Sequence, residues 1–189
     1  RYIDESNDPQ GIVLRATIHE QIGNYTAELT DIDMLVAQHV SPELLRWRAS
    51  IAMEAGAYAV AQRDIQQLLK WQYSPELLSF LGLTYYYQDK PDSALTVFNQ
   101  VIKEVPQQIE TYLYAGALCL EAGEYDLSLN FINAGLIQDP QNATLLFYKG
   151  AALVEKEELT EGCRCLYKAF VNGVDDATDY LTEYCYGAE

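Results

Sequence analysis

The side chains best suited to catalysis are few in this sequence, and they form no catalytic pattern. His19 and His39 are the only histidines, one expected on a helix and the other near a turn. No paired-histidine metal motif, phosphate-binding glycine loop or nucleophile elbow accompanies them. We therefore expect a structural or surface role for both histidines. The sequence predicts no catalytic residue, no metal site and no cofactor.

The four cysteines also form no recognisable site: Cys119, Cys163, Cys165 and Cys185. Cys119 falls on a helix face that is expected to be buried. Cys163 and Cys165 lie two residues apart on a predicted helix, so their side chains point to different sides. Neither arrangement indicates a disulfide framework or a zinc site. Free, buried thiols would favour a reducing compartment.

The elements that position the remaining side chains are paired helices, and residues 75–106 show this best. Apolar and small residues recur there at steps of three and four, the period of one helix face: Leu78, Leu81, Gly82 and Tyr85. Ser74 can cap this helix, and the Pro and Glu that follow suit a first helical turn. Residues 89–92 (Asp-Lys-Pro-Asp) break the pattern. A second amphipathic run, 94–101, ends before Pro106, so the stretch predicts a helix, a turn and a second helix.

This stretch resembles a tetratricopeptide repeat (TPR), whose pattern places an aromatic residue, Leu-Gly, Tyr, Ala, Phe and Pro at fixed offsets. The matching residues are Leu81, Gly82, Tyr85, Ala94, Phe98 and Pro106, and only the first aromatic is replaced, by Leu78. The small residue of each first helix recurs at steps of 33, 33, 34 and 34: Ala16, Ala49, Gly82, Gly116 and Gly150. The resemblance covers about residues 9–173.

The resemblance implies an all-α fold, a right-handed superhelical solenoid of helix-turn-helix repeats. We expect a polar lead-in over residues 1–8 and a single TPR domain over residues 9–189. Five repeats are expected at about residues 9–40, 41–73, 74–106, 107–140 and 141–173. A last helix, at about residues 177–186, is expected to cover the apolar flank of the fifth repeat.

A separate stripe on each first helix carries aromatic and acidic side chains, and in TPR proteins this stripe lines a concave groove. With the small residue counted as position 8, position 6 is aromatic in four successive repeats: Trp47, Phe80, Tyr114 and Tyr148. Carboxylates flank them at positions 2 and 13: Glu43, Glu76, Glu110, Glu54, Glu121 and Glu155. Tyr87 occupies position 13 of the third repeat, and four further residues widen the stripe: Met53, Tyr86, Leu113 and Phe147. We expect an exposed Trp47 whose removal costs little stability.

Two hypotheses follow from this stripe. The first is a non-catalytic protein–protein interaction module, in which aromatic anchors and carboxylates bind a peptide segment with basic and apolar residues. The second is a structural assembly protein that homo-oligomerises through the same groove or through the solenoid ends, so that the large residues become core. A carboxylate clamp of the co-chaperone type is not expected, because the stripe positions that it would use carry no basic residue: Val13, Thr17, Trp47, Glu76 and Ser79.

The charge of the chain narrows the choice of partner. It has 28 acidic and 12 basic side chains, a net charge of -16. Such a surface disfavours nucleic acid, which needs clustered Lys and Arg, and suits basic protein partners. No apolar run approaches the roughly 20 residues that span a bilayer, so no membrane insertion is expected. The thiols slightly favour a cytoplasmic location, and the start at Arg1 without Met leaves an exported fragment as the alternative.

Overall fold

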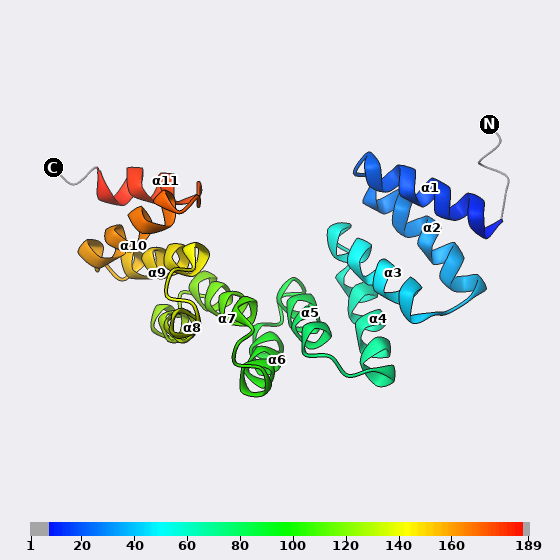
Figure 1. Cartoon of the computed structure of the whole chain (residues 1–189), viewed down its shortest axis with the longest axis horizontal. Helices are drawn as coiled ribbons and strands as arrows, with labels where there is room; N and C mark the ends of the chain where they lie inside the picture. Colours follow the sequence, from blue (N-terminus) through cyan, green and yellow to red (C-terminus); the bar gives the residue numbers. More distant parts are fainter. Residues whose placement is uncertain (1–7, 187–189) are drawn as a thin grey trace. The chain divides into compact units, whose positions relative to one another are not determined.

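The computed structural model describes residues 8–186, and over this range it is helical and contains no strand (Figure 1). The helices are α1 (Pro9–Gln21), α2 (Tyr25–Gln38), α3 (Pro42–Glu54), α4 (Tyr58–Trp71), α5 (Pro75–Tyr86), α6 (Pro91–Glu104), α7 (Ile109–Glu121), α8 (Tyr125–Gln138), α9 (Ala143–Glu155), α10 (Leu159–Val171) and α11 (Ala177–Tyr180). Helix α11 continues as a π-helical turn over Leu181–Cys185. The all-α prediction is confirmed. No helix over the described range is long and apolar enough to cross a membrane.

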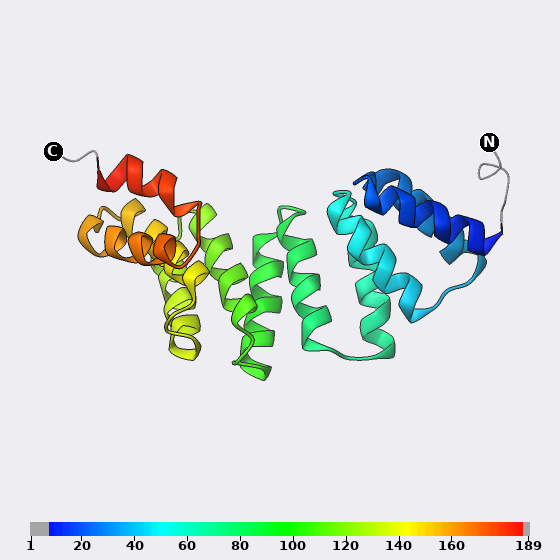
Figure 2. The same cartoon turned by 45° about the horizontal axis from the view of Figure 1, so that its top comes forward.

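By its internal packing the chain divides into two compact units, residues 1–97 and 98–189, with the boundary inside α6. In the first unit α1 packs on α2, α2 on α3, α3 on α4 and α4 on α5 (Figure 1). In the second unit α7 packs on α8, α8 on α9 and α9 on α10, as the turned view also shows (Figure 2). Each unit is thus a stack of helix pairs in which most contacts join neighbours along the chain, as in repeat proteins.

Serine caps start two of the first helices of these pairs. The Oγ of Ser41 accepts a hydrogen bond from the backbone N–H of Leu44, at 3.2 Å. The Oγ of Ser74 accepts one from Leu77 in the same way, at 3.3 Å. Proline follows each serine as the first helical residue, where its missing N–H costs nothing. The predicted cap at Ser74 is therefore confirmed.

The turn inside every helix pair passes through the left-handed region at one position, seven residues after the small residue. The residues and φ angles are Gly23 (67°), Gly56 (70°), Asp89 (57°), Gly123 (74°) and Glu157 (65°). Glycine adopts this conformation without a steric penalty, whereas other L-residues pay about 1–2 kcal/mol. Asp89 and Glu157 therefore hold a backbone shape that suits glycine better.

The small residue of the first helix lets the two helices of a pair approach closely. A Cβ added at Gly150 would lie 2.9 Å from the backbone N of Leu166 and 3.0 Å from the carbonyl oxygen of Gly162. Helices α9 and α10 therefore pack backbone to backbone at this point. At Gly116 the added Cβ would instead meet the side chain of Ile132, with Cδ1 at 2.3 Å.

Partly buried ion pairs join the helices of the first two pairs. The guanidinium of Arg15 on α1 binds both carboxylate oxygens of Asp31 on α2, with Nη2–Oδ1 at 2.6 Å and Nε–Oδ2 at 3.0 Å. Arg48 on α3 binds Asp64 on α4 in the equivalent way, with two contacts of 2.6 Å. Arg48 also donates to Asp33 of α2 at 2.8 Å, which links one pair to the next. Hydrogen bonding to Asp64, more than to Asp33, raises the pKa of Arg48.

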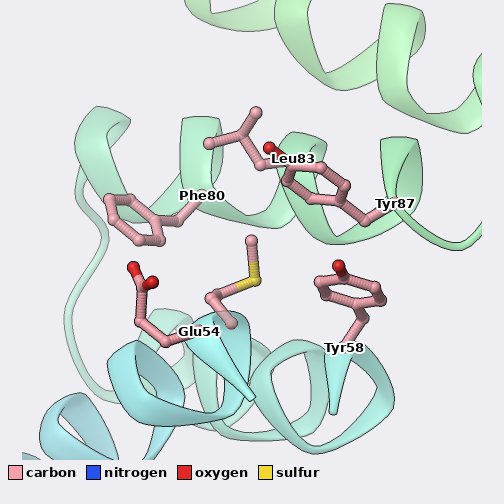
Figure 3. Close-up of a pocket in the computed structure, with 6 residues that line it drawn as sticks. Glu54, Tyr58, Phe80, Leu83 and Tyr87 are labelled. Atoms are coloured by element: carbon pink, nitrogen blue, oxygen red, sulfur yellow. The ribbon is translucent and has the colours of Figure 1, made fainter. Parts of the chain in front are cut away.

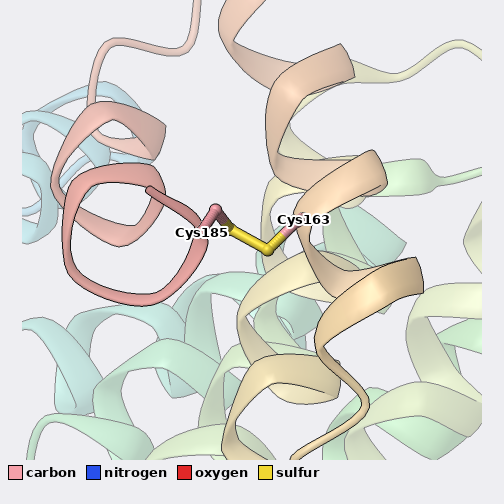
Figure 4. The surroundings of a disulfide bond; sticks show 2 residues. All are labelled: Cys163 and Cys185. Atoms are coloured by element: carbon pink, nitrogen blue, oxygen red, sulfur yellow. A yellow bond between two sulfur atoms is a disulfide. The ribbon is translucent and has the colours of Figure 1, made fainter. Parts of the chain in front are cut away.

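The segment after α10 folds back on the last helix pair and is joined to it by a disulfide. Ala177 and Leu181 are buried in one apolar cluster with Leu166 of α10. Cys163 of α10 is bonded to Cys185, with their Cα atoms 5.7 Å apart (Figure 4). The expectation of four free thiols is therefore wrong for this pair. Sequence spacing could not reveal it, because Cys185 reaches α10 only through the fold of the intervening turn.

The other two cysteines are free and buried, as expected for Cys119. Burial raises the pKa of the Cys119 thiol to about 11, and burial likewise raises that of Cys165. Both thiols are therefore protonated and unreactive at neutral pH. Because Cys163 and Cys185 are paired, the cysteines no longer support the expectation of a reducing, cytoplasmic compartment.

Candidate functional site

An open pocket of about 310 Å³ lies in the first unit, and we call it the first pocket (Figure 3). Its lining comes from the end of α3, the start of α4 and one face of α5: Met53, Glu54, Tyr58, Phe80, Leu83 and Tyr87. Phe80 and Tyr87 are 45% and 50% exposed although they are large aromatic side chains. The Tyr87 ring stacks on Tyr58 with centroids 4.9 Å apart and planes 13° apart. The pocket therefore offers accessible aromatic faces in a fixed arrangement.

The carboxylate of Glu54 gives the first pocket its charge. Figure 3 shows it at the edge of the pocket, pointing toward the ring of Phe80. Glu54 is the last residue of α3, where the helix dipole is negative, and the last turn of α3 has no basic residue to offset it. None of the ion pairs found over residues 8–186 includes Glu54. The carboxylate and the helix end both favour a positively charged group.

A second open pocket, of about 250 Å³, lies in the other unit, and we call it the second pocket. Its lining comes from α7, α8, α9 and α11: Leu120, Glu121, Tyr125, Phe147, Tyr148, Glu155 and Tyr180. Phe147 meets Tyr148 and Tyr180 edge-on, with centroids 5.2 Å and 5.6 Å apart. Burial, followed by the charges of Glu155 and Glu183, raises the pKa of Tyr180. This pocket is also aromatic and acidic.

The predicted stripe residues divide between these pockets and other environments. Met53, Glu54, Phe80 and Tyr87 line the first pocket, and Glu121, Tyr148 and Glu155 line the second. Tyr86 lies against Tyr87, with ring centroids 4.9 Å apart. Tyr114 is half-buried beside Phe98, with ring centroids 6.0 Å apart. These two tyrosines line neither pocket.

The acidic row at position 2 lies at helix starts and not in the pockets. Glu43, Glu76 and Glu110 are exposed in the first turns of α3, α5 and α7. Ser74 Oγ donates to Glu76 at 2.5 Å, and this bond is the main reason that the pKa of Glu76 is lowered. Hydrogen bonds from its own backbone N–H and from Ser41 lower the pKa of Glu43. Glu43 and Glu76 therefore stabilise helix ends.

Trp47 does not stand free on the surface. Its ring is half-buried, and its Nε1 donates a hydrogen bond to the fully buried Glu28 at 3.0 Å. The expectation of an exposed indole is therefore wrong. The period of a helix assigns Trp47 to a face, but it cannot show that a carboxylate from the preceding helix pair reaches that face.

Sequence analysis missed three aromatic residues that the second helices and the last segment contribute to the pockets: Tyr58, Tyr125 and Tyr180. A usable signal was present for two of them. Gly-x-Tyr occurs at residues 56–58 and again at residues 123–125, where glycine forms the turn and tyrosine starts the second helix. Over residues 8–186 no group of three His, Cys, Asp or Glu side chains is arranged to hold a metal ion.

Comparisons with known proteins agree with this architecture. The family model described as tetratricopeptide repeat matches residues 48–109 and 80–143. These ranges together span residues 48–143, or 96 of the 189 residues. No curated protein sequence gives a match.

Solved structures resemble the chain at low sequence identity. A crystal structure of MamA protein is 16% identical, covers 93% of this chain and 94% of its own, and superposes with a TM-score of 0.66. YrrB, described as a TPR protein with an unusual peptide-binding site, is 17% identical, covers 95% and 94%, and has a TM-score of 0.63. A MamA fragment from Desulfovibrio magneticus RS-1 is 23% identical, covers 76% and 90%, and has a TM-score of 0.60. At these identities the likeness concerns the fold.

Proposed function

The chain belongs to the tetratricopeptide repeat family, and from this premise we propose that its pockets bind a segment of another protein that carries basic and apolar residues. The TPR fold supports a protein–protein interaction module, which agrees with the function predicted from the stripe. The solved structures support the predicted fold class. The basic and apolar character of the ligand is our proposal, and no catalytic step forms part of it.

The observation that carries this proposal is the first pocket. Phe80 and Tyr87 leave about half of their surface open around a pocket that also holds the carboxylate of Glu54. Aromatic side chains are the commonest anchors of protein interfaces, because they bury much area at little entropic cost. A nearby carboxylate selects a basic neighbour on the ligand. The net charge of -16 favours the same class of ligand.

The YrrB structure provides an analogy. It is described as a TPR protein with a peptide-binding site, and its fold is similar to that of this chain. It shows that an arrangement of helix pairs of this kind is compatible with a peptide site. The residues proposed to bind here are those of the two pockets of this chain.

The proposal can be tested with a random library of twelve-residue peptides presented to the purified chain. Selected peptides should be enriched in Arg or Lys next to apolar residues. Phe80→Ala should weaken their binding by about 2 kcal/mol, as the loss of an aromatic anchor does. Phe170→Ala is the matched control, because Phe170 is 42% exposed on α10 and lines neither pocket. Equal effects of the two variants, or no basic enrichment, would contradict the proposal.

One observation favours the alternative, assembly through the ends of the helix stack. Helix α1 and the residue at its C-cap expose Leu14, Ile18 and Ile22 at steps of four residues, with 57%, 40% and 67% of their surfaces accessible. A second copy of the chain could cover this apolar face. Light scattering distinguishes the two functions: a dimer that Ile18→Glu dissociates while peptide selection persists would assign α1, and not the pockets, to assembly.

A further inference from the structure

The two pockets occupy equivalent positions of different repeats. In each pocket, three lining residues lie four, five and nine positions after the small residue of one repeat. Two more lie two positions before and five positions after the small residue of the next repeat. The corresponding pairs are Met53 and Leu120, Glu54 and Glu121, Tyr58 and Tyr125, Phe80 and Tyr148, and Tyr87 and Glu155. Both pockets therefore place an apolar residue, a glutamate and two aromatic rings at equivalent positions, one pocket in each unit.

Each pocket brings together three features that attract a cation. Glu54 and Glu121 place a carboxylate at the pocket edge. They end α3 and α7, whose last turns contain no basic residue, so the negative helix end adds to the carboxylate charge. The rings of Phe80 and Tyr148 offer the electron-rich faces that attract cations.

These acidic helix ends work against local stability. A carboxylate in the last turn of a helix is unfavourable because it repels the partial negative charge of the free carbonyl groups. Here that placement occurs in both pockets, and in the second pocket α9 also ends in a glutamate, Glu155. Local rules are often broken at functional sites, and a bound cation would relieve the repulsion.

We infer that each pocket receives an arginine side chain from a bound segment, an inference that rests on the proposed function. A guanidinium is planar, so it can lie against the face of Phe80 or Tyr148 while its N–H groups pair with Glu54 or Glu121. An ammonium group could pair with the carboxylate, but it is compact and strongly hydrated and does not stack. The second pocket contains Glu155 where the first contains Tyr87, so binding there depends more strongly on charge.

The inference can be tested with three short peptides of sequence Ac-Ser-Leu-X-Leu-Ser-NH₂, where X is arginine, lysine or citrulline. Citrulline keeps the shape of arginine and lacks its charge. Binding to the whole chain is followed by calorimetry and by the ring signals of ¹³C-labelled tyrosines. We expect the arginine peptide to bind about tenfold more tightly than the citrulline peptide, with lysine between them. Tyr58→Phe and Tyr125→Phe identify which ring signal reports each pocket.

Substitutions then assign the binding to the pockets. The double variant Glu54→Gln, Glu121→Gln should weaken the arginine peptide by about tenfold, and each single variant should remove only the ring shifts of its own pocket. Glu104→Gln is the matched control, because Glu104 also ends a helix, is exposed and lines neither pocket. It should change the affinity by less than about twofold. Circular dichroism checks that all variants keep the helical fold.

Several results would overturn the inference. Equal binding of the arginine and citrulline peptides, or equal effects of the double variant and Glu104→Gln, would show that the pockets do not select a cation. If the random library still selects peptides in that case, the proposed function stands without the arginine sites. Equal binding of lysine and arginine would rule out guanidinium recognition. If none of the three peptides and no library peptide binds, the inference and the proposed function both fail.

Discussion

The indole Nε1 of Trp47 on α3 donates a hydrogen bond to Oε1 of Glu28 on α2, at 3.0 Å. Glu28 is fully buried, and within residues 8–186 its other oxygen, Oε2, has no hydrogen-bond partner. The bond therefore joins two helix pairs and satisfies part of a costly buried carboxylate. Trp47 contributes to the packing of the first unit.

Removing the hydrogen bond of Trp47 should destabilise the chain. Trp47→Phe retains an aromatic ring but leaves both oxygens of Glu28 without a donor. We expect the free energy of unfolding to fall by about 1–3 kcal/mol, the cost of an unsatisfied buried polar group. Urea denaturation measures the change. Trp71→Phe is the control, because Trp71 is 48% exposed. A loss no larger than that of the control would show that the bond is not important for stability.

The stability of the chain should depend on pH through Glu28. Burial is the main reason that the pKa of Glu28 is raised above its usual 4.5. Between the usual and the raised pKa, the folded chain keeps a proton that the unfolded chain loses, so this group's contribution to stability falls as pH rises. Glu28→Gln stays uncharged and still accepts from Trp47. Its gain in stability over the parent chain should be larger at pH 7 than at pH 4.5, and a gain independent of pH would contradict this account.

The close approach of α9 and α10 at Gly150 should not tolerate a methyl group. Gly150→Ala places Cβ against backbone atoms of Leu166 and Gly162, which cannot rotate away. We expect a loss of about 1–3 kcal/mol from overpacking. Gly116→Ala meets the side chain of Ile132, which can change rotamer, and should cost less. Thermal denaturation measures both losses. A larger loss for Gly116→Ala than for Gly150→Ala would contradict the backbone contact assigned to Gly150.

Glycine should be the better residue at position 157. Glu157 has a φ of 65°, in the turn position that glycine occupies in three other helix pairs. Glu157→Gly relieves the strain of the left-handed backbone but increases the entropy of the unfolded chain. The net gain should be about 0.5–1 kcal/mol. Gly56→Ala makes the opposite change at the equivalent turn and should lower the melting temperature.

Breaking the disulfide should affect the two pockets differently. Tyr180 of the second pocket lies on the segment that Cys185 ties to Cys163. Without the bond, that segment is held only by non-covalent packing, mainly of the buried Ala177 and Leu181. In Cys163→Ser, the tyrosine ring shifts caused by the arginine peptide should weaken in the second pocket and persist in the first. Equal losses in both pockets would argue against a local role for the disulfide.

The repeat architecture could be predicted from the sequence because it depends on local patterns. The small residue that recurs every 33 or 34 positions packs within its own helix pair. The cap at Ser74 likewise acts within one helix pair. Phe80, Tyr87 and Tyr148 were also found from the period of a single helix. Three other features join segments that no local pattern relates: the bond from Trp47 to Glu28, the disulfide to Cys185, and the rings that second helices add to each pocket. They depend on how one pair rests on the next.

The bond between Cys163 and Cys185 also determines what a protease could release from the chain. The turn at Asn172 and Gly173 lies between the two cysteines and is exposed. A cut in this turn would leave the last segment attached to α10 through sulfur. The nicked protein would migrate as one species until a reductant separated its two pieces. Backbone continuity is therefore not required at this turn for the last segment to remain in place.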